Sequence, residues 1–390
     1  MRLRSALALL ALVAVTDAGL FGASAAVAAD ANRDRLIAEI DARYLEAGAP
    51  AWRRVRQEIA AAGEMDLNGL ARAVDGVGDP DVHLVSPADF SVLQAEIDGA
   101  RVGTGLIEFG LEIRRGQPPR VVTPVAGSPA ARAGLRPGDQ LVAIDGRSGE
   151  DLDRPAVMRA LRMAGPVELT VERGGCRRTV RLSPDPRPLV PVTTALVRSG
   201  KSLSGVVRIV QFTPGVAKQV ADALARLDAA GVAGYVLDLR ENPGGLLDQA
   251  EATARLFGAQ ELGALRRADG REEIVTSAVP PRPPKPLVVL IDRGTASAAE
   301  YVAAAVGQLP GARLAGARGA GRGQAQAYAP LADGWGVVIP SARLIVRGRD
   351  IKADPPTPDA SLPDRRLSAK EPPGEVLRLL RQLERNPVQT

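Results

Sequence analysis

Short apolar runs alternate with helix-length segments over the C-terminal half of this 390-residue chain. The apolar, β-branched runs predict buried strands at residues 206–210, 235–237 and 287–291. Apolar residues at helical spacing predict helices at residues 216–227, 246–257 and 298–306. Because strands that alternate with helices form mostly parallel sheets, this half is predicted to fold as a βαβα, α/β core.

Two other patterns precede this core. Apolar residues at helical spacing predict a helical N-terminal segment, and short β-like runs bounded by Gly and Pro then predict a small β-rich domain with helices. The predicted divisions are a signal peptide at 1–28, the helical segment at 30–100, the small domain at 101–185, the core at 186–365, and a C-terminal helix and tail at 366–390.

The N-terminus has the pattern of a cleaved secretory signal. Arg2 and Arg4 precede an apolar run at 6–15, and the small residues at 26–29 read AVAA. The run is too short to span a membrane comfortably, and Asp17 would interrupt a longer helix. We expect an exported protein that is soluble after cleavage, with an uncleaved anchor as the alternative.

The composition excludes several kinds of site. One cysteine, Cys176, and one histidine, His83, exclude a disulfide framework and a His- or Cys-rich metal site. Arginine dominates the 50 basic residues, since only five are lysine, and no basic run is interleaved with aromatic residues. We therefore expect no metal and no nucleic-acid partner.

Glycine-rich motifs mark the small domain. Residues 103–106 read GTGL, and residues 127–146 read GSPAARAGLRPGDQLVAIDG. Together they resemble a PDZ domain, which captures an extended peptide by strand addition and receives its C-terminal carboxylate on backbone N–H groups. The resemblance implies that the peptide-binding loop consists of Gly103, Thr104, Gly105 and Leu106. The alternative is a PDZ module that only packs against its neighbour.

Two strand-to-helix turns carry the candidate chemistry. Residues 238–247 read DLRENPGGLL, and their glycines can point N–H groups at one spot beside a helix N-terminus. Asp238 and Arg240 are expected to brace this turn. Residues 292–300 read DRGTASAAE, which places Ser297 at a turn of the kind that displays nucleophiles. Taken alone, Ser297 is more often a helix N-cap.

The order of these motifs, followed by AGARGAGRGQAQ at 315–326, resembles the carboxyl-terminal processing (tail-specific) proteases. The resemblance implies a ClpP/crotonase-like core with an inserted PDZ domain, in the envelope or periplasm of a bacterium. It implies a serine endopeptidase with a Ser–Lys dyad and no cofactor. Ser297 would be the nucleophile, with Gly244, Gly245 and the Ala298 amide as the oxyanion hole and Gln326 orienting the base.

The position of the general base departs from that family. Its lysine lies in a G-K-G-x-x-Q segment, and residues 321–326 here read GRGQAQ, which places Arg322 at the lysine position. Burial can bring a lysine pKa towards neutrality, so that lysine can act as a base. A guanidinium is not deprotonated in a protein, so Arg322 cannot take the proton from Ser297.

Other bases fit poorly. Lys285 lies at the far end of the strand that leads to Ser297, and no motif ties Lys201 or Lys218 to the site. Lys352 follows the last core strand and is not excluded, and His83 is more often structural than basic.

Three functions remain open after this sequence reading. The leading one is an endopeptidase whose substrates are proteins or peptides bound through their C-termini. The first alternative is a catalytically silent homologue that binds C-terminal peptides as an adaptor or regulator. The second is a structural subunit that forms a homo-oligomer through the helix at 376–383.

Overall fold

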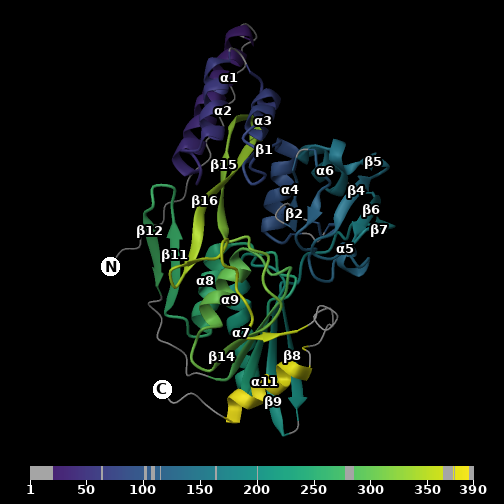
Figure 1. Cartoon of the computed structure of the whole chain (residues 1–390), viewed down its shortest axis with the longest axis vertical. Helices are drawn as coiled ribbons and strands as arrows, with labels where there is room; N and C mark the ends of the chain where they lie inside the picture. Colours follow the sequence, from purple (N-terminus) through teal and green to yellow (C-terminus); the bar gives the residue numbers. More distant parts are fainter. Residues whose placement is uncertain are drawn as a thin grey trace.

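The computed structural model describes residues 21–62, 65–100, 103–106, 110–114, 116–162, 165–199, 201–276, 285–362, 372 and 374–385. Within these residues the strands form three sheets. The molecule is elongated, with the first helices at one end, the α/β core at the other and the small domain to one side (Figure 1). The fold class is therefore as predicted.

The core sheet has the strand order β18-β14-β13-β10-β9-β8. Its strands are β8 (Val192–Ser199), β9 (Ser202–Ile209), β10 (Gly234–Asp238), β13 (Leu287–Ile291), β14 (Ala312–Gly316) and β18 (Ala360–Ser361). All neighbouring pairs are parallel except β8 with β9. The helices are α7 (Val216–Ala229), α8 (Leu247–Leu256), α9 (Ala298–Val306) and α11 (Gly374–Arg385).

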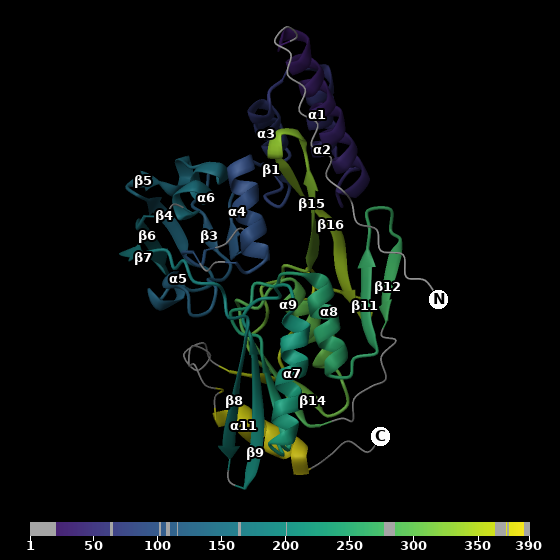
Figure 2. The same ribbon diagram turned by 180° about the vertical axis from the view of Figure 1, so that it is seen from behind.

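Alternation along the strands buries both faces of this sheet. Val207, Leu237 and Val289 pack against α7, α8 and α9 on one face of the sheet. The preceding residues, Val206, Val236 and Val288, pack against α11 on the other face. Figure 2 shows α11 crossing the sheet on the side away from α7. Because Val376 and Leu380 are buried against the chain's own strands, the proposed homo-oligomer through this apolar face is wrong.

A second, largely antiparallel sheet was not predicted. It has the order β1-β16-β11-β12, with β15 and β17 also paired to β16. The strands are β1 (His83–Val85), β11 (Glu261–Arg266), β12 (Glu272–Thr276), β15 (Gln324–Pro330), β16 (Gly336–Val346) and β17 (Arg349–Asp350). The β15–β16 hairpin extends from the core to the N-terminal helices, where Val337 and Ile339 pack around Trp52 (Figure 1).

The N-terminal segment is helical except for β1. Its helices are α1 (Phe21–Arg43), α2 (Pro50–Ala61), α3 (Leu67–Asp75) and α4 (Pro87–Ile97). Strand β1 instead joins the second sheet, with His83 opposite Val338. Residues 1–20 lie outside the described residues, and α1 runs through the predicted cleavage site. Of the helices described, none is sufficiently long and apolar to cross a membrane.

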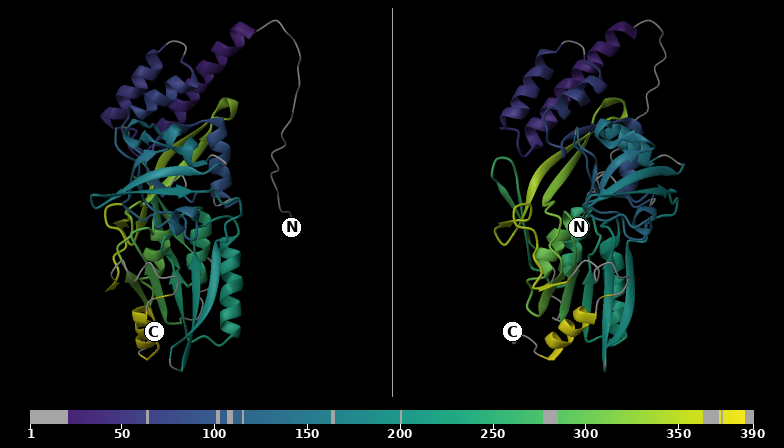
Figure 3. Two further views of the ribbon diagram at one scale, coloured as in Figure 1. Left: turned by 90° about the vertical axis from the view of Figure 1, so that its right-hand side faces the viewer. Right: turned by 45° about the vertical axis from the view of Figure 1, so that its right-hand side comes forward.

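The small domain has its own sheet and core. Its elements are β2 (Leu111–Glu112), β3 (Arg120–Val121), α5 (Pro129–Arg132), β4 (Gln140–Ile144), β5 (Arg147–Ser148), α6 (Arg154–Arg162), β6 (Val167–Arg173) and β7 (Cys176–Leu182). Along the molecule's long axis it lies between the N-terminal helices and the core (Figure 3). The α6 side chain of Arg162 pairs with Asp89 of α4 at 3.3 Å, which joins it to the N-terminal segment.

Candidate active site

The turns that follow β10 and β13 meet at one end of the core sheet. Both strands are parallel neighbours, so their carboxyl ends lie at the same edge, where open α/β sheets commonly place their sites. The Thr295 Oγ1 donates to the Leu239 carbonyl at 2.8 Å, and the Ala296 N–H donates to the Asn242 carbonyl at 2.9 Å. These bonds hold the two predicted motifs together.

Ser297 occupies a strained backbone conformation between β13 and α9. Its φ of 53° and ψ of −123° lie in a region that a residue with a side chain rarely adopts. Its own N–H donates to Glu300 Oε2 at 3.0 Å, which helps to hold this geometry. The sharp turn leaves the Ser297 side chain half-buried. Nucleophilic serines in other proteins are displayed at strand-to-helix turns of this kind.

The glycine turn lies directly against Ser297. A Cβ on Gly244 would stand 2.9 Å from the Ser297 Cβ and 3.0 Å from the Ala298 nitrogen, and Gly244 has a φ of 100°. Only glycine therefore permits this approach. A Cβ on Gly245 would stand 2.3 Å from the Phe212 carbonyl oxygen.

The three N–H groups predicted for an oxyanion hole differ in the hydrogen bonds that they make. The Gly244 N–H donates to Asn242 Oδ1 at 2.8 Å, so it is already used within the turn. Ala298 is the first residue of α9, so its N–H has no acceptor within the helix. No acceptor among the described residues takes the Gly245 N–H either. Of the predicted set, the N–H groups of Gly245 and Ala298 are therefore the ones that have no acceptor among the described residues.

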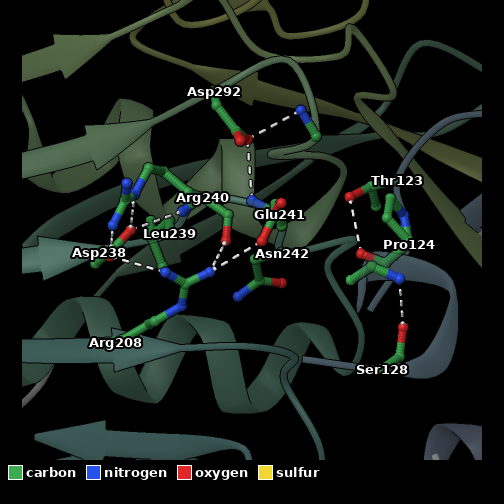
Figure 4. Close-up of polar contacts among 12 residues, drawn as sticks. Thr123, Pro124, Ser128, Arg208, Asp238, Leu239, Arg240, Glu241, Asn242 and Asp292 are labelled. Atoms are coloured by element: carbon green, nitrogen blue, oxygen red, sulfur yellow. Dashed lines mark hydrogen bonds and ion pairs between the residues drawn. The ribbon is translucent and has the colours of Figure 1, made fainter. Parts of the chain in front are cut away.

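A buried ion cluster braces the turn after β10. The Arg240 guanidinium is fully buried and pairs with Asp238 at 2.6 Å, and Arg208 contacts both Asp238 and Glu241 (Figure 4). The predicted bracing role of Asp238 and Arg240 is confirmed. Asp292 Oδ1 accepts the Glu241 N–H at 3.0 Å, and burial raises the pKa of Asp292 to about 6.

Glu300 is the buried centre of the site. Its carboxylate accepts three N–H groups, from Ser297, from Gly321 at 2.8 Å and from Arg322 at 2.9 Å. Ser297 and Arg322 donate to the same oxygen, so their backbones lie side by side. Burial raises the pKa of Glu300 to about 7, although the three N–H bonds oppose this rise. The sequence reading did not single out this residue.

The Arg322 side chain is engaged by a residue from the N-terminal segment. Its Nη2 donates to Asp81 Oδ1 at 2.9 Å, and both side chains are mostly buried, at 22% and 16% exposed. Asp81 lies 241 residues earlier, in the turn before β1. No sequence pattern indicated this ion pair.

Two further candidate residues, Gln326 and Lys352, lie close to Arg322 in the chain or in space. Gln326 lies on β15, two residues after Gln324, and its buried Oε1 has no hydrogen-bond partner within the described part of the chain. Lys352 donates from Nζ to Gln324 Oε1 at 2.8 Å, and its backbone nitrogen would stand 2.4 Å from a Cβ on Gly323. Lys352 is therefore beside the loop that carries Arg322.

The remaining bases lie elsewhere. Lys285 donates to Asp228 at 2.7 Å beyond the start of β13, and Lys218 pairs with Asp222 on α7. Lys201 lies in the turn that joins β8 to β9. His83 is buried in β1, in a pocket whose lining residues come from β1, α4 and α6.

The predicted peptide-binding loop lies at the start of the small domain's sheet. Gly103 pairs with Asp185, and Thr104 and Leu106 are buried. A Cβ on Gly105 would overlap the Ser128 side chain at 2.0 Å, so this close packing requires glycine there. Residues 107–109, which would follow this loop in a peptide groove, lie outside the described residues.

Comparison with known proteins agrees with this arrangement. The sequence model of peptidase family S41 matches residues 204–362, and that of the PDZ domain matches residues 120–173. The carboxyl-terminal-processing protease of Synechocystis sp. is 35% identical over 275 residues, which cover 68% of this chain and 63% of that protein. That of Picosynechococcus sp. is 32% identical over 305 residues, covering 75% and 72%.

The carboxy-terminal processing protease CtpA of Bacillus subtilis is 33% identical over 251 residues, which cover 63% of this chain and 53% of that protein. The chain thus spans less than two thirds of the Synechocystis and Bacillus proteins. Among solved structures, the photosystem II D1 C-terminal processing protease matches with a TM-score of 0.74 at 27% identity, covering 90% of this chain and 96% of that chain.

Proposed function

Because the chain belongs to the carboxyl-terminal processing proteases of peptidase family S41, we propose that it is an exported serine endopeptidase-like protein. Its PDZ domain captures substrate C-termini, and Ser297 attacks the peptide bond. The observation that carries this proposal is the strained Ser297, which lies against Gly244 and directly precedes the Ala298 N–H at the start of α9. Among the described residues, neither the Ala298 N–H nor the nearby Gly245 N–H has an acceptor. Such N–H groups stabilise the oxyanion that forms during acyl transfer.

The reaction needs a proton acceptor. As the Ser297 Oγ bonds to the carbonyl carbon, its proton must leave and the carbonyl oxygen becomes an oxyanion that the N–H groups hold. The proton then passes to the leaving amine as the C–N bond breaks, and water releases the acyl group by the same steps. Arg322 cannot accept that proton, so we expect the native protein to be weak as a peptidase.

The Arg322 ion pair also favours a second candidate function. The ion pair between the Arg322 guanidinium and Asp81 is a structural contact, and it does not depend on peptidase activity. A catalytically silent homologue that binds C-terminal peptides as an adaptor or regulator would have such a site. Both functions use the PDZ domain to bind peptides, so peptide binding does not distinguish them. The reactivity of Ser297 does.

A fluorophosphonate probe tests the peptidase proposal at Ser297. The native protein is expected to be labelled slowly at this residue, because the oxyanion donors can hold the phosphonyl oxygen while the base is missing. Peptide mapping by mass spectrometry locates the label, and Ser297→Ala is the control. An unlabelled, correctly folded native protein would favour the silent adaptor.

Capture of C-termini predicts a requirement for the free carboxylate. Peptides with an apolar last residue are expected to bind, and amidating the C-terminus is expected to weaken binding by more than about tenfold, because charge-assisted N–H bonds are lost. Calorimetry on the full chain measures both forms. Equal affinity of the two would contradict a carboxylate site at residues 103–106.

Export predicts a shortened mature chain. The protein is expected in the periplasm with about 28 residues removed at the A-x-A end. Mass spectrometry of the fractionated protein measures its N-terminus. Material that still starts at Met1 would instead support the uncleaved anchor.

A further inference from the structure

The turn formed by residues 79–82 joins three parts of the molecule. The Tyr44 hydroxyl donates to Asp79 Oδ2 at 2.9 Å from the N-terminal helices, and Arg154 Nη2 of the PDZ domain donates to the Pro80 carbonyl at 2.5 Å. Asp81 contacts the third part, the loop that carries Arg322, through its ion pair with that residue. Because contacts from three sides hold this turn, the Asp81 carboxylate has a defined position beside residue 322.

Two carboxylates face residue 322 in different ways. Glu300 of α9 takes the backbone N–H of Arg322, whereas Asp81 takes the guanidinium. Lys352 is the nearby cation, and its Nζ is turned to Gln324. Among the described residues, Asp81 is therefore the charged group that contacts the end of the Arg322 side chain. In a lysine at position 322, that end would carry the amine that acts as a base.

We infer that Asp81 is a second determinant of the site's chemistry, because its carboxylate lies where it would favour the protonated form of a lysine at position 322. This inference rests on the proposed function. A carboxylate within about 4–6 Å of a cationic group favours the charged form and typically shifts a pKa by 1–3 units. A lysine stem ends about one bond short of the guanidinium nitrogens, so an amine at position 322 stays within this range.

A general base must be neutral before it can accept a proton. Each unit by which Asp81 raises the pKa of a lysine at position 322 lowers its neutral fraction about tenfold at pH values below that pKa. Restoring the lysine alone therefore restores only part of the base. Neutralising Asp81 as well is expected to supply the rest, so the two substitutions act together.

The test compares Arg322→Lys with Arg322→Lys/Asp81→Asn in the full chain, using cleavage of an unfolded protein. At pH 7 the double variant is expected to be at least about tenfold faster, and the acid limb of its kcat/KM profile is expected to lie at least about one pH unit lower. The two rates converge at high pH, where both lysines are neutral. A merely structural effect of Asp81 would not move the pH profile.

Matched variants complete the design. Arg322→Lys/Asp81→Glu keeps the carboxylate and is expected to retain the profile of Arg322→Lys, and Asp81→Ser replaces Asp81→Asn if the latter fails to fold. If Arg322→Lys gains activity and neutralising Asp81 changes neither rate nor profile, the role of Asp81 is wrong and the peptidase proposal stands. If no variant gains activity and none is labelled at Ser297, both proposals are wrong.

Discussion

Arg322→Lys is expected to raise the rate of peptide-bond cleavage towards the gain of about 10²–10⁴-fold that a positioned general base supplies. The substitution places an amine that can lose its proton where a guanidinium stands, on a stem of similar length. Ser297, the proposed nucleophile, lies close by, because its N–H and that of Arg322 donate to the same oxygen of Glu300. Release of new amino termini from an unfolded protein substrate measures the gain.

Two controls identify the source of that gain. Adding Ser297→Ala to Arg322→Lys is expected to abolish it, and Arg322→Met, which has no titratable group, is expected to stay as slow as the native protein. A native protein that is already fully active and is slowed by Arg322→Lys would place the base elsewhere. Lys352 would then be the first candidate, since its Nζ donates to Gln324, two residues after Arg322.

The pH dependence of stability is expected to carry a large contribution from Glu300. Its folded-state pKa of about 7 lies above its ordinary value of 4.5, so folding takes up a proton between these values. The stabilisation is fully present below pH 4.5 and is lost as the pH rises through 7. At 1.36 kcal/mol per pKa unit, this contribution to the free energy of unfolding falls by about 2–3 kcal/mol between pH 5 and pH 8.

Glu300→Gln isolates this contribution, because glutamine does not titrate. Urea unfolding of both proteins from pH 5 to pH 8 is expected to show a smaller loss of stability in the variant, by about that amount. Asp292 titrates in both proteins, so its contribution cancels. Glu272→Gln, on the exposed strand β12, is the control and is expected to leave the pH dependence unchanged. An unchanged pH dependence in Glu300→Gln would contradict the raised pKa.

When Glu300 is ionised, its carboxylate accepts hydrogen bonds from the Ser297 and Arg322 N–H groups. Above pH 7 the site is therefore held together at some cost in stability, because a charge is buried. The backbone strain at Ser297 has the same character, since strained conformations persist only where the surroundings hold them. The N-terminus of α9 thus holds Ser297 in position at a cost in stability.

Local pattern predicted the elements that carry the site. The buried strands at Tyr235 and at Leu287 and the helix that begins at Ala298 follow from runs of apolar residues of the right length. The second sheet was missed, because its strand β16 pairs with β1 from the N-terminal segment and with β11, where Ala264 lies opposite Ile345. Pairing between segments far apart in the chain leaves little trace in local periodicity.

The sequence by itself determined that residue 322 is an arginine and that His83 is the single histidine, since side-chain identity settles which groups can lose a proton. Tertiary structure alone decided which N–H groups remain available and which charges meet. Asn242 uses the Gly244 N–H, and Asp81 reaches Arg322 across 241 residues. Hydrogen-bond partners and electrostatic neighbours depend on distances of a few ångströms, and only the folded chain brings these groups that close.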